Sequence, residues 1–342
     1  DLPPAKDGGL ALGIRLTEAA HIALDSIGRI LLADTASGRI WAIANVNGVY
    51  RTQHVAGNGE QGGFVDGALA IDSPLARPKA IAVGSNGEIL VADSGTQTIA
   101  VIEGHGDRSV IHHVIGHAVG NAVGAFPDGT PGKVVKLGSP TDLAIVDDLV
   151  IVGQLAPQLI SFRRIEESYF ATIGVDDSQR QEYVLSRQAD AAADDYVLPN
   201  LQGIHLADDG ILFTGYGPPG RVLHRDGQNH VALFGLTPSD TEGQLRAGIA
   251  IAPYGIDGAL VAEGHQIVKY TQVNGVTVRE VVAGTGEGES ASGSNGDNGP
   301  ALAARITPNF ILKIDANNYF VSTPRFIRKI SFPEGSITLV AG

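Results

Sequence analysis

Residues 80–94 read AIAVGSNGEILVADS, and this stretch decides the fold class. Two short apolar runs lie on either side of Asn86 and Gly87, and the second run ends in Ala92 and Asp93. Asn-Gly between two apolar runs is a strong short-range signal for a β-hairpin with a two-residue turn. We therefore expect two antiparallel strands here, joined by a tight turn.

The same unit recurs along the chain. Its apolar triplets are 45 to 62 residues apart and begin at Ile22, Ile81, Leu143, Ile204, Ile249 and Ile311. A third apolar run follows each corner, and a fourth often ends in Val-Ala-Gly, as at residues 55–57. Small four-stranded sheets cannot bury both faces alone, but radial stacking of repeated sheets buries them. The sequence therefore predicts an all-β fold, a six-bladed β-propeller of four-stranded antiparallel blades. A β-sandwich or a pair of β-domains is the alternative.

We expect a single propeller domain over residues 1–342. The predicted blades cover approximately residues 7–57, 58–116, 117–175, 197–235, 244–284 and 285–342. Residues 176–196 form an insertion between the third and fourth blades. This insertion contains no Gly or Pro, and Ser178 suits a helix N-cap, so the segment has helical character.

Composition excludes several classes of function. The net charge of −13 opposes a nucleic-acid partner, since phosphate binding needs clustered Lys and Arg. The absence of cysteine removes disulfides, zinc-thiolate sites and thiol nucleophiles. No apolar run reaches the roughly 18 residues of a spanning helix, so we expect no membrane span. These features fit a cytosolic or an exported bacterial protein. We expect a secreted or periplasmic monomer whose signal peptide has been removed.

A glycine-rich loop precedes the hairpin unit and makes the repeat recognisable. It reads GFVDGALAIDSPLARP at residues 63–78 and is followed by Ile-Ala-Val, by NGEILVADS and by a third apolar strand. Related versions occur at residues 124–129 and 295–308. This pattern resembles the NHL-repeat family of six-bladed β-propellers over most of the chain. The resemblance implies the fold and leaves the activity open, because the motif residues are structural.

A propeller brings the loops before its inner strands and the corners after its second strands to one face, around a central channel. Aligning the repeats places candidate ligand-binding residues at this channel mouth: His21, Lys79, Thr141, Asp142, Gln202, Tyr216, His265, Asn309 and Arg325. The corner residues Asp34 and Asp93 are expected to accept backbone N–H groups instead of a ligand. His112 and His113 alternate along an outer strand and are expected on its surface. The sequence assigns no catalytic residue.

Two functions remain open. The leading interpretation is a non-enzymatic binding scaffold without a cofactor, which presents its loop-rich upper face to a protein, peptide or glycan. It rests on the absence of a convergent catalytic set. The alternative is a metal-dependent hydrolase or lyase in the channel, with calcium held by Asp142 and Asn309 and with His21 as a base. Lys79 in the same ring opposes a bound cation.

Overall fold

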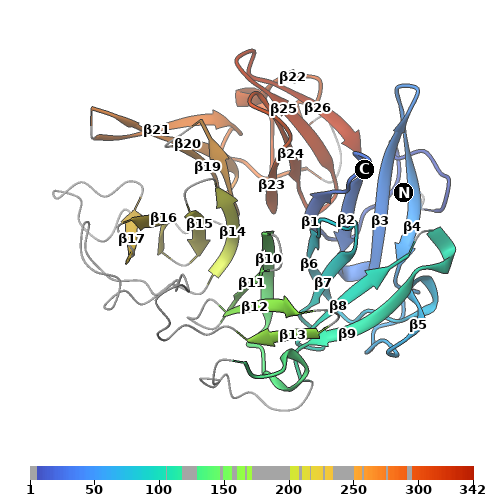
Figure 1. Ribbon diagram of the computed structural model, residues 1–342. Coiled ribbons are helices and arrows are strands. Elements are labelled where there is room, and N and C mark those ends of the chain that lie inside the picture. Colours follow the sequence, from blue (N-terminus) through green and yellow to red (C-terminus); the bar gives the residue numbers. More distant parts are fainter. Residues whose placement is uncertain are drawn as a thin grey trace.

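The computed structural model describes residues 6–104, 106–117, 129–146, 149–155, 160–165, 168–171, 201–207, 210–215, 217–225, 228–233, 250–255, 258–274, 276–290 and 295–342. Its strands form four sheets of four strands and two sheets of five, with antiparallel pairing throughout. Figure 1 shows these sheets arranged around a common centre. The fold is therefore an all-β propeller, as predicted.

The first three sheets follow the chain order. The first contains β1 (Ala19–Leu24), β2 (Ile30–Asp34), β3 (Arg39–Val46) and β4 (Val49–Ala56). The second contains β5 (Ala68–Leu69), β6 (Pro78–Val83), β7 (Ile89–Asp93), β8 (Thr98–Glu103) and β9 (Val110–Ile115). The third contains β10 (Pro140–Val146), β11 (Leu149–Gln154), β12 (Ile160–Ile165) and β13 (Ser168–Ala171).

The remaining sheets repeat this arrangement. One contains β14 (Leu201–Ala207), β15 (Gly210–Gly215), β16 (Gly217–Arg225) and β17 (Gln228–Leu233). The next contains β18 (Ala250–Tyr254), β19 (Gly258–Glu263), β20 (Gln266–Val273) and β21 (Val276–Ala283). The last contains β22 (Gly299–Pro300), β23 (Phe310–Lys313), β24 (Asn318–Ser322), β25 (Ile327–Ser331) and β26 (Ser336–Ala341).

The prediction of four strands in every sheet was wrong for two of them. The short strands β5 and β22 come from the glycine-rich loops and pair with the outer strands β9 and β26. Each added strand has only two residues, because the loop turns away into a single 3-10 turn, η2 (Ala70–Asp72) or η6 (Ala301–Ala303).

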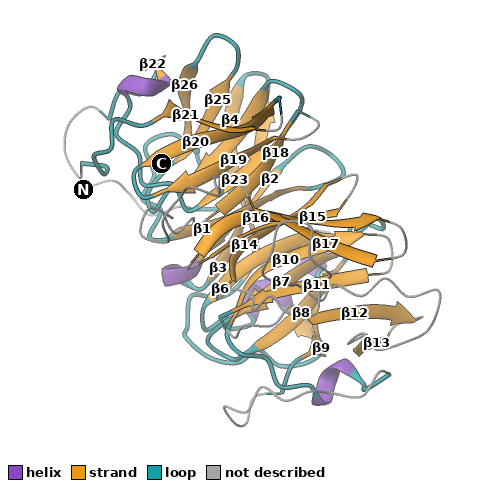
Figure 2. Cartoon of the chain, turned by 90° about the vertical axis from the view of Figure 1, so that its left-hand side faces the viewer, coloured by secondary structure: helices purple, strands orange, loops and turns teal. Residues whose placement is uncertain are grey.

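Helical structure in the described part of the chain is limited to such turns. The others are η1 (Thr35–Ser37), η3 (Gly106–Arg108) and η4 (Gly132–Val134). Figure 2 shows how little of the described molecule they occupy. Among these residues no helix is long and apolar enough to cross a membrane. The predicted helical insertion at residues 176–196 lies outside the described residues.

The inner strands contact one another in a closed cycle. β1 contacts β6, β6 contacts β10, and the cycle continues through β14, β18 and β23 back to β1. Near the chain ends, Gly13 N–H donates to Gly342 O over 2.8 Å, and Gly342 N–H donates to Ala11 O over 3.0 Å. Among the described residues, the last sheet contains no strand from the N-terminal part of the chain.

Apolar residues pack between neighbouring sheets. One cluster joins the first sheet to the last two, and its members include Trp41, Ile267 and Ile337. A second cluster joins the second and third sheets, and a third joins the first and second. The strands β2 and β7 are buried at every position, as strands covered on both faces must be.

The hairpin turn at Asn86 and Gly87 is longer than the sequence predicted. Gly84 N–H donates to Glu88 O, so Ser85, Asn86 and Gly87 form a three-residue loop. Gly87 has a φ of 84°, as the last position of such a loop requires. The prediction of a two-residue turn at Asn86 and Gly87 was therefore wrong. The first strand ends one residue earlier than the Asn-Gly pair indicates, so Ser85 also belongs to the loop.

Candidate functional site

Three of the predicted channel-mouth residues lie at β-bulges where inner strands begin: Lys79, Thr141 and Gln202. The pairing register shifts between Ala19 and His21, Pro78 and Ala80, Pro140 and Asp142, and Leu201 and Gly203. The residues skipped by these shifts are Ala20, Lys79, Thr141 and Gln202. Alignment of the repeats thus assigned these residues to equivalent positions. A bulge leaves its extra residue unpaired and changes the direction of the next side chain.

The residues after two of these bulges meet at the centre of the ring. His21 Nε2 and Asp142 Oδ1 are 2.7 Å apart, and the two side chains are 5% and 1% exposed. Asp142 also accepts the N–H groups of Leu143 and Ile204, each over 2.7 Å. Ile81 N–H donates to His21 Nδ1 over 3.4 Å. Both ring nitrogens of His21 and both oxygens of Asp142 therefore have partners on other strands.

Two further rings surround this pair. Phe310, the first residue of β23, stacks on His21 with centroids 3.7 Å apart. His205 of β14 is half-buried nearby, and its burial lowers its pKa to about 4. The positive charge of Lys313 and the His21 ring act in the same direction, while Asp142 opposes them. His205 is therefore neutral near pH 7 and adds no charge to the pair.

The other predicted site residues do not join His21 and Asp142 in a single cluster. Lys79 is half-buried and lies 3.7 Å from the Glu18 carboxylate, and Thr141 is buried. Asn309 donates from Nδ2 to Ala19 O over 3.0 Å. His265 and Arg325 are exposed, and Thr307 Oγ1 lies 3.3 Å from His265 Nδ1. For Gln202 only the backbone is described, and Tyr216 lies outside the described residues.

The residues proposed for calcium have partners within the protein in this structure. Each Asp142 oxygen already accepts at least one hydrogen, and the Asn309 amide nitrogen, which cannot bind a cation, is directed at the backbone of β1. Among the described residues no three His, Asp or Glu side chains form a group that could hold a metal ion.

The corner carboxylates have the structural role that the sequence predicted. Asp34 accepts the N–H groups of Thr17 and Glu18. Asp93 accepts four N–H groups, those of Ala76, Arg77, Gly95 and Thr96. His112 and His113 lie in the outer strand β9, also as predicted, and both are half-buried.

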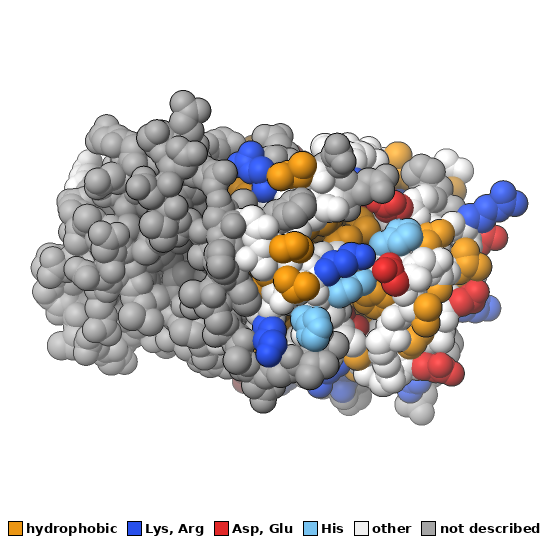
Figure 3. All heavy atoms as spheres, turned by 60° about the horizontal axis from the view of Figure 1, so that its bottom comes forward, with side chains coloured by type: hydrophobic (Ala, Val, Ile, Leu, Met, Phe, Trp, Pro, Cys, Tyr) orange, Lys and Arg blue, Asp and Glu red, His pale blue; other side chains and the backbone are white. Residues whose placement is uncertain are grey.

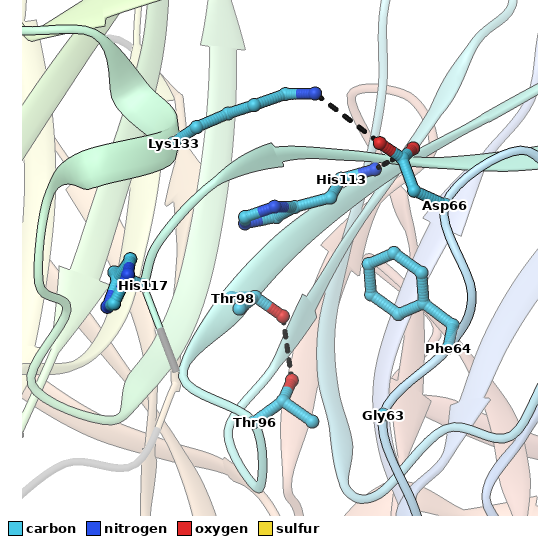
Figure 4. A pocket seen from close by; sticks show the side chains of 8 residues that line it. All are labelled: Gly63, Phe64, Asp66, Thr96, Thr98, His113, His117 and Lys133. Atoms are coloured by element: carbon cyan, nitrogen blue, oxygen red, sulfur yellow. Dashed lines mark hydrogen bonds and ion pairs between the residues drawn. The ribbon is translucent and has the colours of Figure 1, made fainter. Parts of the chain in front are cut away.

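A solvent-open pocket of about 500 Å³ lies beside this outer strand, and the sequence analysis did not identify it. It is lined by Gly63, Phe64, Asp66, Thr96, Thr98, His113, His117 and Lys133. Figure 4 shows Lys133 extended towards Asp66 and the Phe64 ring facing the hollow. Figure 3, in which the bottom of Figure 1 comes forward, shows histidines beside basic and acidic side chains. The pocket combines aromatic, charged and hydroxyl groups in reach of solvent.

Asp66 organises one side of this pocket. It accepts His113 N–H over 3.0 Å, and it lies 3.5 Å from Lys133 Nζ and 3.3 Å from His112 Nδ1. Burial alone would raise the pKa of Asp66, but the His113 N–H, Lys133 and His112 together hold it below its usual value. Asp66 is therefore a carboxylate over the physiological pH range.

Comparison with known proteins agrees with the fold. A family model described as the NHL repeat matches residues 75–102, which include β6, β7 and most of β8. No curated protein matches the chain.

Solved structures show the same fold in proteins of different kinds. A gluconolactonase from Xanthomonas campestris has 11% identity and a TM-score of 0.52, over 98% of this chain and 99% of that one. Virginiamycin B lyase from Staphylococcus aureus has 12% identity and a TM-score of 0.51, over 97% and 87%. A chain of the nidogen–laminin complex has 12% identity and a TM-score of 0.53, over 90% and 91%. At these identities the likeness concerns the fold alone.

Proposed function

Because this chain is a β-propeller that carries the NHL repeat, we propose that it is a non-enzymatic scaffold that binds a protein or peptide. One observation carries the proposal: His21 and Asp142, the titratable pair at the centre, are buried and occupied by each other and by backbone groups. A general base needs access to the proton that it removes. This pair instead ties β1, β6, β10 and β14 together.

Polar groups that are open to solvent line the pocket beside β9. Several of them belong to the corner between β7 and β8 and to the segment after β9, and this proposal assigns the partner to these loops. Loops held on a rigid sheet are the usual place for binding residues. In this proposal the six sheets are six blades of one ring, and the partner contacts their loops.

The experiment compares wild type with Asp142→Ala in two assays, hydrolysis of lactones and esters and urea unfolding. The scaffold proposal predicts no turnover by either protein and a loss of about 1–3 kcal/mol in unfolding free energy for Asp142→Ala, since buried partners lose their acceptor. Asp72→Ala, which removes an exposed carboxylate, serves as the control and should leave stability unchanged. Turnover by wild type that Asp142→Ala abolishes without loss of stability would refute the scaffold proposal.

The second candidate is the metal-dependent hydrolase or lyase of the channel. A histidine held by a carboxylate is an arrangement used by general bases, which favours this candidate. Virginiamycin B lyase has the same fold, and its variant with alanine in place of a histidine is described as catalytically inactive. Elemental analysis of the purified protein for calcium would support this candidate if one ion per chain were found with a Tm that falls on chelation.

We also propose that the protein acts as a monomer in the periplasm or outside the cell. The acidic, cysteine-free sequence is compatible with this placement and equally with a cytosolic one. Fractionation of the native host tests the location, and sedimentation tests the oligomeric state. A cytoplasmic location or a stable dimer would contradict the respective part.

A further inference from the structure

The pocket beside β9 occupies a position that recurs in other sheets. In four sheets a glycine with positive φ follows the outer strand, and an added Cβ there would lie within about 3 Å of the residue that begins the third strand. These glycines are Gly57, Gly116, Gly284 and Gly342, and the facing residues are Arg39, Thr98, Gln266 and Phe326. Three of the four facing side chains are large, and Thr98 is the small one.

In the first sheet the arginine fills this position. Arg39 Nη2 donates to Asn58 O over 2.8 Å, and its Nη1 donates to Ser37 O over 3.2 Å. A Cβ added at Gly59 would lie 2.2 Å from the same guanidinium, so the group lies directly against the backbone. The first sheet thus contains a guanidinium held between backbone carbonyls.

The second sheet repeats this corner without the guanidinium, and the residue that corresponds to Gly59 in its sequence is Ala118. When the two repeats are aligned, Thr96 and His117 correspond to Ser37 and Asn58. The two corners also have the same backbone conformation, with φ of 60° at Gly38 and 59° at Gln97. Both residues line the pocket. Within the described part of the chain, neither carbonyl accepts a hydrogen bond. The hydroxyl groups of Thr98 and Thr96 are hydrogen-bonded to each other over 2.7 Å, and the short Thr98 side chain leaves the volume open.

Two other lining groups suit a planar cation. Phe64 presents an aromatic ring, on which guanidinium groups stack. Asp66 contributes a carboxylate, which lies 3.5 Å from Lys133 Nζ. The side chain of Lys133 is 57% exposed and that of Asp66 is 52% exposed. Exposed pairs of this kind contribute little, so a guanidinium can take the place of the lysine at Asp66. The net charge of −13 adds a long-range attraction for basic partners.

We propose that this pocket binds the guanidinium group of an arginine side chain presented by a partner protein. The inference rests on the proposed scaffold function and names the chemistry that the scaffold recognises. The bound group lies near the position that Arg39 takes within its own sheet, between the carbonyls of Thr96 and His117, over Phe64 and beside Asp66.

The test is calorimetric titration of the full chain at pH 8 with a blocked peptide, Gly-Ser-Arg-Ser-Gly, at low salt. We expect saturable 1:1 binding that weakens with added NaCl. The same peptide with citrulline, which keeps the shape and loses the charge, should bind at least tenfold more weakly. Free arginine amide should bind more weakly than the peptide, which distinguishes a protein partner from a small guanidinium compound as the ligand.

Two variants locate the binding. Thr98→Arg supplies the side chain that the first sheet uses, and it should weaken peptide binding at least tenfold while the Tm is kept or raised. Ser85→Arg, at an exposed hairpin tip, adds the same charge and should leave binding unchanged. Absence of binding, equal binding of the citrulline peptide, preference for an acidic peptide, or unchanged binding by Thr98→Arg would each overturn the inference. None of these results involves Asp142, so they are distinct from failure of the scaffold proposal.

Discussion

At the scale of residues, the polar groups at the centre of the ring connect one strand to the next. Asp142 on β10 accepts from Ile204 on β14, and Asn309 beside β23 donates to Ala19 on β1. Ser322 Oγ donates to Ala20 O over 3.3 Å across the same junction. Buried polar groups of this kind are costly when unpaired, and here each is paired across a sheet boundary.

His205 makes the stability of the protein depend on pH. Burial lowers its folded pKa to about 4, and an unfolded histidine titrates near 6.5, so the unfolded chain binds the extra proton between these values. Stability contributed by neutral His205 is therefore complete above pH 6.5 and is lost as the pH falls towards 4. We expect this residue to account for up to about 3 kcal/mol of the decrease in unfolding free energy.

Urea unfolding at half-unit steps between pH 7.5 and 4 measures this dependence. His205→Gln should have a flatter profile than wild type, because glutamine does not titrate. His117→Gln, on an exposed side chain, provides the matched control and should follow wild type. Parallel profiles for wild type and His205→Gln would contradict the prediction.

The sequence predicted the positions of individual site residues better than the contacts between them. Repeat alignment assigned Lys79 and Thr141 to equivalent positions, and both lie at bulges. The contact between His21 and Asp142 spans 121 residues and depends on closure of the ring, which no local pattern encodes. The pocket was missed for a different reason. Its signal is a small residue, Thr98, where another repeat has Arg39, and this shows only when the repeats are compared at that position.

At the scale of elements, the end of the outer strand depends on one glycine in four of the sheets. Gly116 has a φ of 100°, and an added Cβ would lie 2.4 Å from Gln97 O. Side chains are unfavourable at positive φ, and a contact this close requires the backbone to move. A glycine at this position is therefore needed for the close approach of the chain after β9 to the start of β8.

Gly116→Ala should destabilise the protein by more than about 2 kcal/mol, since backbone strain and a steric clash add. Gly106→Ala is the matched control: φ is 64° there, and nothing lies within 4 Å of the added Cβ. It should cost about 1 kcal/mol, from strain alone. Thermal unfolding followed by circular dichroism compares the two, and equal losses would show that the clash at Gly116 is relieved without cost.

The strands were predictable from their apolar runs, and their turns only in part. Asn86 and Gly87 indicated a hairpin correctly, but the same dipeptide fits a three-residue loop when its glycine takes the last position. The strands β5 and β22 could not be predicted, because each has only two residues and lies in a glycine-rich loop.

At the scale of the whole molecule, the first and last sheets share one core. Trp41 lies in the same apolar cluster as Ile337 and Val340, although the chain segments are about 300 residues apart. Backbone hydrogen bonds between Gly13, Ala11 and Gly342 lie at the same junction. The ring is thus closed by packing and hydrogen bonds, and the propeller class followed from the repeats because only radial stacking buries so many similar sheets.

We expect this closure to make unfolding cooperative. Trp41 is the single tryptophan, so its fluorescence reports on the first sheet, while far-ultraviolet circular dichroism reports on all sheets. The two urea transitions should coincide. Ile337→Ala in the last sheet should lower both midpoints together, with a loss of about 2–4 kcal/mol. Separate transitions, or a change in one probe alone, would show that the sheets unfold independently.

The recurring position that faces the outer-strand glycine affects how many binding sites one molecule can have. Arg39, Gln266 and Phe326 each close, from within the chain, a site of the kind that Thr98 leaves open. Shortening any one of them would open another receptor site at a fixed spacing around the ring, without altering a strand. Evolution or protein engineering could therefore change a monovalent binder into a multivalent one by single substitutions, and the avidity would follow from the geometry of the ring.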